Sequence, residues 1–241
     1  MDKIVYLKKV VLLMIVVGLF YAGMTSVFGV QGATSIAAGE TSRANFSDDS
    51  TASLAVQSGN VTQLNITGTA ISDHWAGFYG EVSGNMTLSN AAGDVFYEWE
   101  GLNAIAGEVF ASTSGSVDWS TIACIGATGI ANLETALGIV PTDADRINQT
   151  YTVATHPGIT VAGTALSACN TTNAYINTGK DATTFYQILL ADTSGDGNPV
   201  FTTLINETTT GFDGVTHDFQ LLVGEEDSAA TTDLYFYIEL S

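Results

Sequence analysis

Alternating side chains around residue 97 constrain the fold of this chain more than any other sequence feature. The run VFYEWE places Val95, Tyr97 and Trp99 on one side and Phe96, Glu98 and Glu100 on the other. A repeat of two residues is the geometry of a β-strand. Residues 89–94 form a turn-rich cluster before this run, so a hairpin is predicted. We expect this hairpin, within the aromatic-rich stretch 74–101, to form the centre of an all-β core.

Short runs of the same kind recur along the chain. Further strands are predicted at residues 54–56, 61–71, 108–112, 151–154, 159–162, 174–176, 185–191, 200–205, 215–223 and 234–240. About ten short strands separated by turn signals are typical of a β-sandwich or barrel. The sequence therefore predicts an all-β fold, an immunoglobulin-like or jelly-roll-like β-sandwich, in a single domain that covers residues 54–241.

One segment departs from this pattern. Residues 130–137 carry apolar side chains at helical spacing, and Gly138 follows them as a stop signal. A second helical turn is predicted at residues 143–148, after a proline and a capping threonine. We expect a helical insertion between strands around residues 119–148.

The N-terminus has the pattern of a secretory signal. Lysines near the start precede an uncharged apolar run at residues 10–30, and Val30 and Gly32 suit a signal-peptidase site before Ala33. Two interpretations stay open: residues 1–32 are cleaved, or the apolar run is kept as a membrane anchor. Both place the rest of the chain outside the cytoplasm.

The chain beyond the signal is acidic. Residues 33–53, rich in Ser, Thr, Ala and Gly, are predicted to be a flexible leader. The whole chain has a net charge of −19, and loss of residues 1–32 removes three lysines and one aspartate, which leaves −21. Such a surface repels nucleic acid and anionic lipid. We therefore expect no nucleic-acid partner, and membrane contact only through residues 10–30 if they are retained.

Asparagine and cysteine usage indicate the same extracytoplasmic compartment. Seven N-x-[ST] sequons, together with a signal, indicate a surface glycoprotein, although a chain rich in Thr and Asn also produces sequons by chance. The sequon asparagines are Asn45, Asn60, Asn65, Asn85, Asn148, Asn170 and Asn206. The chain has only two cysteines, Cys124 and Cys169, and outside the cytoplasm such a pair predicts one disulfide.

The most specific candidate for an ion site is the loop at residues 192–198. Its spacing matches the first half of a calcium-binding loop, with Gly197 at the sharp turn, but Thr203 stands where a bidentate Glu is required. The candidate ligands are Asp192, Ser194, Asp196 and Asn198. The loop is either a Ca²⁺ site or an ordinary turn rich in Asp and Gly.

No constellation of catalytic residues supports an enzyme. Glu98 and Glu100 share one strand face, as a glycosidase carboxylate pair could, but a solvated strand end explains them better. The three histidines, His74, His156 and His217, are scattered, and a catalytic triad is recognised by geometry and not by chain order. We expect a protein that is not an enzyme and has no cofactor besides the calcium considered above.

In overall character the chain resembles archaeal secreted surface proteins, the β-sandwich subunits of filaments and S-layer-associated coats. The resemblance rests on the signal, the Thr-, Asn- and Gly-rich chain, the sequons, the single cysteine pair and the C-terminal run LYFYIEL. It implies donor-strand exchange, in which the N-terminal segment of one subunit completes the sheet of the next. Residues 35–38 or 53–57 are candidates for that added strand.

We therefore expect an extracellular, cell-surface structural protein that assembles with itself into a filament or coat. The alternative is a secreted carbohydrate- or ligand-binding β-sandwich whose partners are cell-surface glycans. That alternative needs several aromatic side chains exposed on one sheet face, such as Tyr235 and Tyr237. A secreted hydrolase is the weakest of the three hypotheses.

Overall fold

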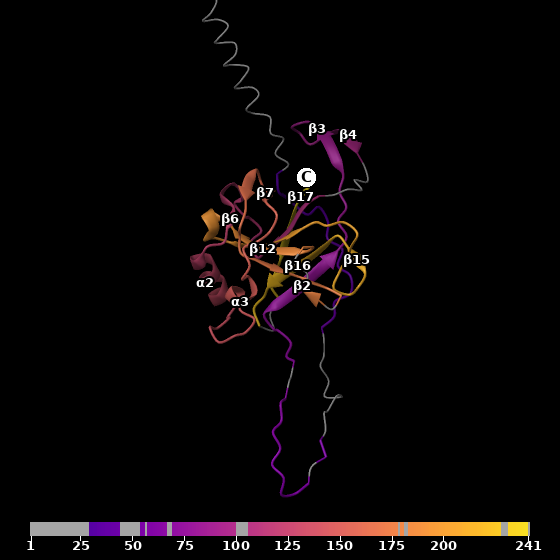
Figure 1. The fold of residues 1–241 in the computed structure, drawn as a ribbon. Coiled ribbons are helices and arrows are strands. Elements are labelled where there is room, and N and C mark those ends of the chain that lie inside the picture. The colour runs from indigo at the N-terminus through magenta and orange to yellow at the C-terminus, as the bar shows by residue number, and fades with distance from the viewer. Residues whose placement is uncertain are drawn as a thin grey trace, which may run out of the picture.

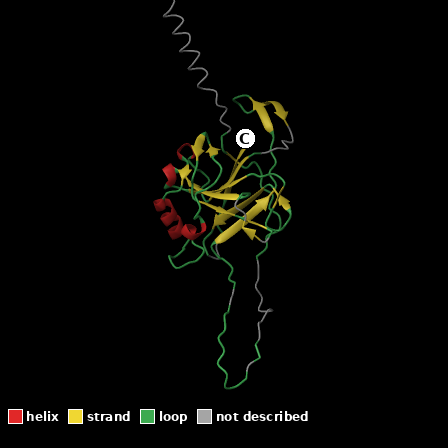
Figure 2. Ribbon diagram, viewed as in Figure 1, coloured by secondary structure: helices red, strands yellow, loops and turns green. Residues whose placement is uncertain are grey.

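The computed structural model shows an all-β protein with a few short helices (Figure 1, Figure 2). Its strands pair antiparallel in one large sheet and several two-stranded sheets. The fold class predicted from the sequence is therefore confirmed. The residues that the structure describes are 29–43, 54–55, 57–66, 69–99, 106–177, 179–180, 183–227 and 231–240.

A seven-stranded sheet forms the centre of the fold. Its order is β1 (Gln31–Gly32), β17 (Tyr235–Leu240), β5 (Gly107–Ser112), β13 (Pro199–Leu204), β12 (Tyr186–Ala191) and β6 (Ala123–Cys124), while β9 (Thr171–Asn173) also pairs with β12. The strands predicted at 108–112, 185–191, 200–205 and 234–240 are thus confirmed. The strand predicted at 151–154 is reduced to one isolated bridge between Val153 and Thr171.

The middle strands of this sheet are buried on both faces. On β5, Val109 belongs to one apolar cluster and its neighbour Phe110 to a second. On β12, Leu189 and Leu190 divide between the same two clusters. Successive side chains of a strand point to opposite faces, so a strand buried on both faces requires an unbroken apolar run. This explains why the run ILLA in β12 shows no alternation.

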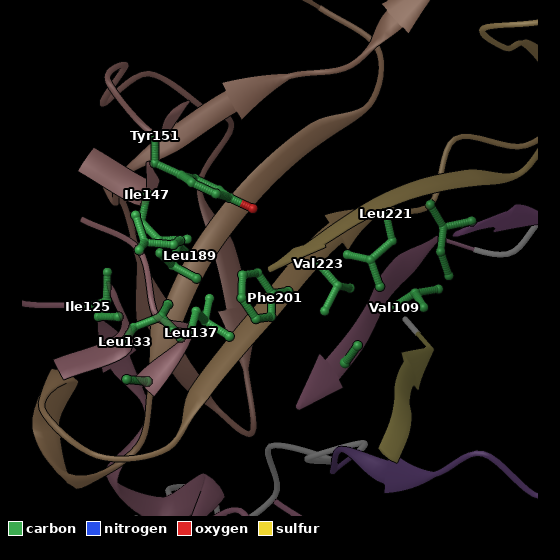
Figure 3. Close-up of a cluster of buried hydrophobic side chains, with 14 residues drawn as sticks. Val109, Ile125, Leu133, Leu137, Ile147, Tyr151, Leu189, Phe201, Leu221 and Val223 are labelled. Atoms are coloured by element: carbon green, nitrogen blue, oxygen red, sulfur yellow. The ribbon is translucent and has the colours of Figure 1, made fainter. Parts of the chain in front are cut away.

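A second layer covers one face of the central sheet. The pair β2 (Trp75–Gly80) and β16 (Phe219–Gly224) packs there, together with helices α2 (Ala127–Ala136) and α3 (Ile147–Thr150). Figure 3 shows the side chains that meet in this layer, among them Leu133, Leu137, Ile147, Leu189, Phe201, Leu221 and Val223. Removal of this apolar surface from water, worth about 25 cal/mol per Å², holds the layer on the sheet.

Shorter elements cover the opposite face. They are the hairpin of β7 (Ile159–Val161) and β8 (Thr164–Leu166) and the 3-10 helix η1 (Trp119–Thr121). The Trp119 ring lies 5.1 Å from the Phe110 ring and 5.1 Å from the Tyr237 ring. The central sheet is therefore enclosed between two coverings, which is how this sandwich-like fold differs from two equal stacked sheets.

Three further hairpins and one turn of helix complete the described elements. The hairpins are β3 (Met86–Ser89) with β4 (Val95–Trp99), β10 (Tyr175–Ile176) with β11 (Gly179–Lys180), and β14 (Thr209–Thr210) with β15 (Thr216–His217). The 3-10 helix η2 (Thr193–Gly195) connects β12 to β13.

The hairpin predicted around residue 97 forms, but its predicted place at the centre of the core is wrong. Strands β3 and β4 pair across the turn at residues 89–94 and with no other described strand. The apolar side chains of β4, those of Val95, Phe96, Tyr97 and Trp99, are exposed. Alternation specifies that a strand forms, whereas the partners of that strand depend on contacts far away in the chain.

Another predicted strand is also absent. Residues 61–71 alternate in sequence, yet the described residues 57–66 and 69–71 contain no strand. The same holds for residues 54–55 of the run predicted at 54–56. A strand needs a neighbour for its main-chain hydrogen bonds, and none of the described strands lies beside this segment.

The helical insertion predicted around residues 119–148 is confirmed in kind. Helix α2 ends before Gly138, which has a φ of 69°, a left-handed conformation that suits glycine. The second helix starts later than predicted, at Ile147. The Asp143 carboxylate accepts a hydrogen bond from the Val140 N–H at 2.8 Å and closes a turn where the helix was expected.

The predicted disulfide is present between Cys124 and Cys169. It joins β6, at the end of the central sheet, to the segment just before β9, and so ties the helical insertion to the sheet. Residues 1–28 of the predicted signal and residues 44–53 of the predicted leader lie outside the described residues. Within the described part of the chain, no helix is long and apolar enough to span a bilayer.

Replacement of both cysteines by alanine is expected to lower the free energy of unfolding by roughly 4 kcal/mol, because the bridge closes a 45-residue loop and restricts the unfolded chain. Chemical denaturation measures the loss. A reducing agent should destabilise the wild type to a similar degree and leave the double variant unchanged. Equal stability of the wild type with and without reductant would contradict this role.

Candidate functional site

The outer edge of β17 is the first feature of the molecule that could meet a partner. On its inner side β17 pairs with β5 along its whole length, Tyr235 to Leu240. On its outer side, the only strand among the described residues is the two-residue β1, and the Ala33 N–H adds one bond to the Phe236 carbonyl at 3.0 Å. The middle of this edge, Phe236 to Ile238, is therefore paired, and only the ends of β17 have no partner strand among the described residues.

Two buried carboxyl groups lie next to this edge. Glu239 of β17 stands directly opposite Glu108 of β5, and Glu108 is in turn opposite Leu204 of β13. Glu108 is 7% exposed and Glu239 is 5% exposed. Val30, the residue before β1, packs in the apolar cluster on the same sheet face. The carboxyl pair is thus enclosed by apolar side chains on both flanks.

The β7–β8 turn covers the pair from above the sheet. The Ala162 N–H in that turn donates a hydrogen bond to Oε2 of Glu239 at 2.8 Å. Ala162 has a φ of 48°, an uncommon conformation for a residue with a side chain. The turn conformation and the position of the Glu239 carboxylate are therefore coupled.

Burial changes the acidity of both groups. Loss of contact with water, together with the smaller effect of the neighbouring Glu239 charge, raises the pKa of Glu108 from 4.5 to about 7. Burial also raises the pKa of Glu239, while the hydrogen bond from Ala162 acts against that rise. Two carboxyls this close resist simultaneous ionisation, so the pair retains a proton to higher pH than exposed glutamates do.

This pair was not predicted from the sequence. Glu108 and Glu239 are far apart in the chain, and only the register of β5 against β17 brings them together. With less than a tenth of each residue exposed, the carboxyl groups cannot contact a polymeric substrate. Their direct effect is therefore on the stability of the β5–β17 pairing, where like charges opposite each other are unfavourable.

The loop predicted as a calcium site serves as a tight connection between β12 and β13. The buried Asp192 carboxylate accepts hydrogen bonds from the Asn198 main-chain N–H at 2.6 Å, the Asn198 amide at 2.8 Å and the Asp118 N–H at 3.2 Å. Ser194, Asp196 and Asn198 are exposed. The described residues contain no group of three or more His, Cys, Asp or Glu side chains placed to hold a metal ion. Calcium binding at this loop stays a prediction.

His74 and His217 have different carboxylate partners and do not form one site. The His217 ring lies 3.1 Å from the Asp213 carboxylate and contacts the Tyr79 ring, whereas His74 lies 3.7 Å from Asp143. Glu98 is exposed and accepts a hydrogen bond from Asn85 at 2.9 Å. Its predicted companion, Glu100, lies outside the described residues.

Three exposed aromatic side chains, Phe96, Tyr97 and Trp99, lie on the β3–β4 hairpin. The Tyr97 and Trp99 rings of β4 meet edge to face, with centroids 4.8 Å apart. Of the two tyrosines proposed for ligand binding, Tyr235 is exposed, but Tyr237 packs on Trp119 and donates its hydroxyl to the Ser114 carbonyl at 2.8 Å. The hairpin therefore offers one aromatic surface to a ligand, and the Tyr79–Phe212 ring pair, with centroids 4.9 Å apart, is about equally exposed.

The predicted glycosylation sites differ in accessibility. Five sequon asparagines are exposed: Asn60, Asn65, Asn85, Asn148 and Asn206. Asn170 is half-buried, follows the buried Cys169, and donates its side-chain amide to the Tyr151 carbonyl at 3.4 Å. Asn45 lies outside the described residues.

The fold and these surfaces define an all-β, disulfide-bonded protein with an open sheet edge and exposed aromatic and aliphatic side chains away from its core. Comparison with protein-family models, with curated proteins and with solved structures finds no match to this chain.

Glu108→Gln is expected to remove a pH dependence of stability. Below pH 4.5 the glutamate is protonated in both folded and unfolded chains; between 4.5 and about 7 only the unfolded chain releases the proton. The free energy of unfolding of the wild type should therefore fall by about 3 kcal/mol more than that of the variant across this range. Urea denaturation at pH 4, 6 and 8 measures it.

Glu226→Gln, at an exposed glutamate, is the matched control and should follow the wild type. If Glu108→Gln loses stability with pH as steeply as the wild type, the buried pair does not govern this dependence.

In protein isolated from its natural host, glycan occupancy at Asn60, Asn65, Asn85, Asn148 and Asn206 is expected to exceed that at Asn170, because the Asn170 side chain is half-buried next to the buried Cys169. Peptide mass spectrometry gives the occupancy of each site. If none of the asparagines carries a glycan, the sequons reflect only the Thr- and Asn-rich composition of the chain. High occupancy at Asn170 would contradict the role of burial.

Proposed function

We propose that this protein is an extracellular structural subunit that assembles with itself at the cell surface into a filament or coat. The observation that carries the proposal is the outer edge of β17. That edge belongs to the central sheet, yet the two residues of β1 are its only strand partner among the described residues. An open edge is a template for pairing with another chain, and proteins either protect such an edge or use it.

Removal of the predicted signal would open this edge further. The predicted cleavage follows Gly32, so it takes away both residues of β1 and also Val30, which packs beside Glu239. The main-chain groups of β17 on that side would then need water or a segment from elsewhere. A segment of a second copy meets that need by β-augmentation.

The leader has the properties of such a segment. Residues 33–39 carry no charge, and residues 34–43 are exposed and outside any helix or strand. Subunits with a net charge near −21 repel one another. Main-chain hydrogen bonds between the uncharged leader of one copy and the β17 edge of another would add attraction without adding charge. High salt would screen the remaining repulsion.

The extracellular location is supported by two further observations. The Cys124–Cys169 disulfide is the kind of bond that persists in oxidising compartments outside the cytoplasm. Five sequons lie on exposed asparagines, where glycans can be accommodated.

A second candidate function is binding of carbohydrate. The observation in its favour is the exposed Tyr97–Trp99 pair on β4, since aromatic rings stack on sugar rings. Its weakness is that the hairpin presents these rings on a protruding surface and not in a concave site.

The test compares the chain from Ala33 onward with a variant that also lacks residues 33–66. The described residues of this range, except Ala33, are exposed, and none of them belongs to the two apolar clusters, so the variant should keep its circular dichroism spectrum. We expect the longer chain to form large assemblies in native salt and the variant to be monomeric, as measured by light scattering. A longer chain that stays monomeric at high concentration would refute the proposal. Specific retention of this chain on glycan resins would then favour carbohydrate binding.

A further inference from the structure

Residues 57–66, which we call the arm, carry exposed apolar side chains that belong to neither of the two apolar clusters. Val61 is 102% exposed, Ile66 is 89% exposed and Leu64 is 58% exposed. The sequence alternates as a strand does, with Leu64 and Ile66 on one side of an extended chain and Asn65 on the other. Within a single copy, none of the described strands pairs with this segment. The arm therefore has the composition of a strand and lacks its partner.

The β3–β4 hairpin has the same deficiency. Its register and the Tyr97–Trp99 ring contact place Leu88, Tyr97 and Trp99 on one side, which we call the hairpin face. Each of these side chains is about half exposed or more. A two-stranded sheet is only marginally stable in water unless its apolar face is covered. The hairpin face thus needs a covering that the rest of the described chain does not supply.

The two surfaces lie on opposite sides of the molecule. Figure 1 shows the arm running away from the lower end of the body, while β3 and β4 project from its upper end. The arm of one copy therefore does not reach its own hairpin face. A contact between two different surfaces of identical subunits is head to tail, and it extends into a filament unless the rotation closes a ring.

Charge favours a second copy as the partner. The arm has no charged residue in a chain that carries 25 acidic side chains, and the hairpin face is uncharged as well. These are surfaces where two strongly acidic copies can approach with little added repulsion. The sequon asparagines lie on the sides that face away from this contact. Asn65 alternates with Leu64 and so points to the other side of the arm. The Asn85 side chain reaches Glu98, which is on the other side of the hairpin.

We propose that Leu64 and Ile66 of one copy pack on the hairpin face of the next copy and join the copies head to tail. This inference rests on the proposed function, because it names a contact through which the copies meet. It is a packing of side chains and is separate from strand addition at the β17 edge.

The test uses the chain from Ala33 onward with Leu64→Asp in the arm or Tyr97→Asp on the hairpin face. Each should weaken self-association by about tenfold or more, since each places a charge in the apolar contact. Gln63→Asp and Phe96→Asp are the matched controls, because they add the same charge to the neighbouring residue on the other side of each segment. The controls should assemble like the wild type in sedimentation velocity experiments.

A mixture of Leu64→Asp and Tyr97→Asp chains gives the decisive readout. The intact arm of the Tyr97→Asp chain can pack on the intact hairpin face of the Leu64→Asp chain, but the pair has no second arm–hairpin contact. In chains that begin at Glu40, which lack the uncharged leader segment 33–39 that would add to the β17 edge, the mixture should therefore form heterodimers that do not grow. A contact between two arms or between two hairpins would not be restored by mixing.

The other outcomes separate this inference from the proposed function. Assembly that is lost in Leu64→Asp and unchanged in Tyr97→Asp would mean that the arm docks elsewhere, which overturns the inference and leaves self-assembly standing. Equal weakening by the matched controls would also overturn it. A monomeric wild type would refute both, and glycan binding lost in Tyr97→Asp alone would assign the hairpin face to carbohydrate.

Discussion

The hydrogen-bonded ladder of β5, β13 and β12 is the interaction on which the rest of the structure depends. These three strands pair along most of their lengths and carry buried apolar side chains on both faces. Each face can therefore bury a covering layer: β2, β16 and the helices on one side, and β7, β8 and η1 on the other. The short strand β6 attaches to β12, and its Cys124 connects the ladder to the disulfide.

A sheet enclosed on both faces makes any charge within it costly, which gives Glu108 and Glu239 their importance. A carboxylate deprived of water is stabilised only by a nearby opposite charge or by hydrogen bonds. The protein supplies Glu239 with the Ala162 N–H, and burial shifts Glu108 toward its protonated form. Because Val30 packs on the same face near the β17 edge, a segment bound at that edge also controls how much water reaches the pair.

The described chain separates a well-packed centre from surfaces that lack partners. The β17 edge lacks a full neighbouring strand, the arm lacks a surface to pack on, and the hairpin face lacks a cover. These surfaces bring main-chain groups and uncharged side chains to the outside of a strongly acidic protein. In the assembly proposed above, such a distribution would favour ordered contacts between copies over nonspecific association, since the charge on the remaining surface keeps copies apart.

The sequence by itself determined what depends on neighbouring residues. Alternation and apolar runs predicted that β5, β12, β13 and β17 are strands. Helical spacing and Gly138 predicted α2, and the cysteine count predicted the disulfide. Only the tertiary structure decided which strand pairs with which. Pairing depends on contacts between residues far apart in the chain, so it moved the aromatic hairpin out of the core, left residues 57–66 without a neighbour, and set Glu108 opposite Glu239.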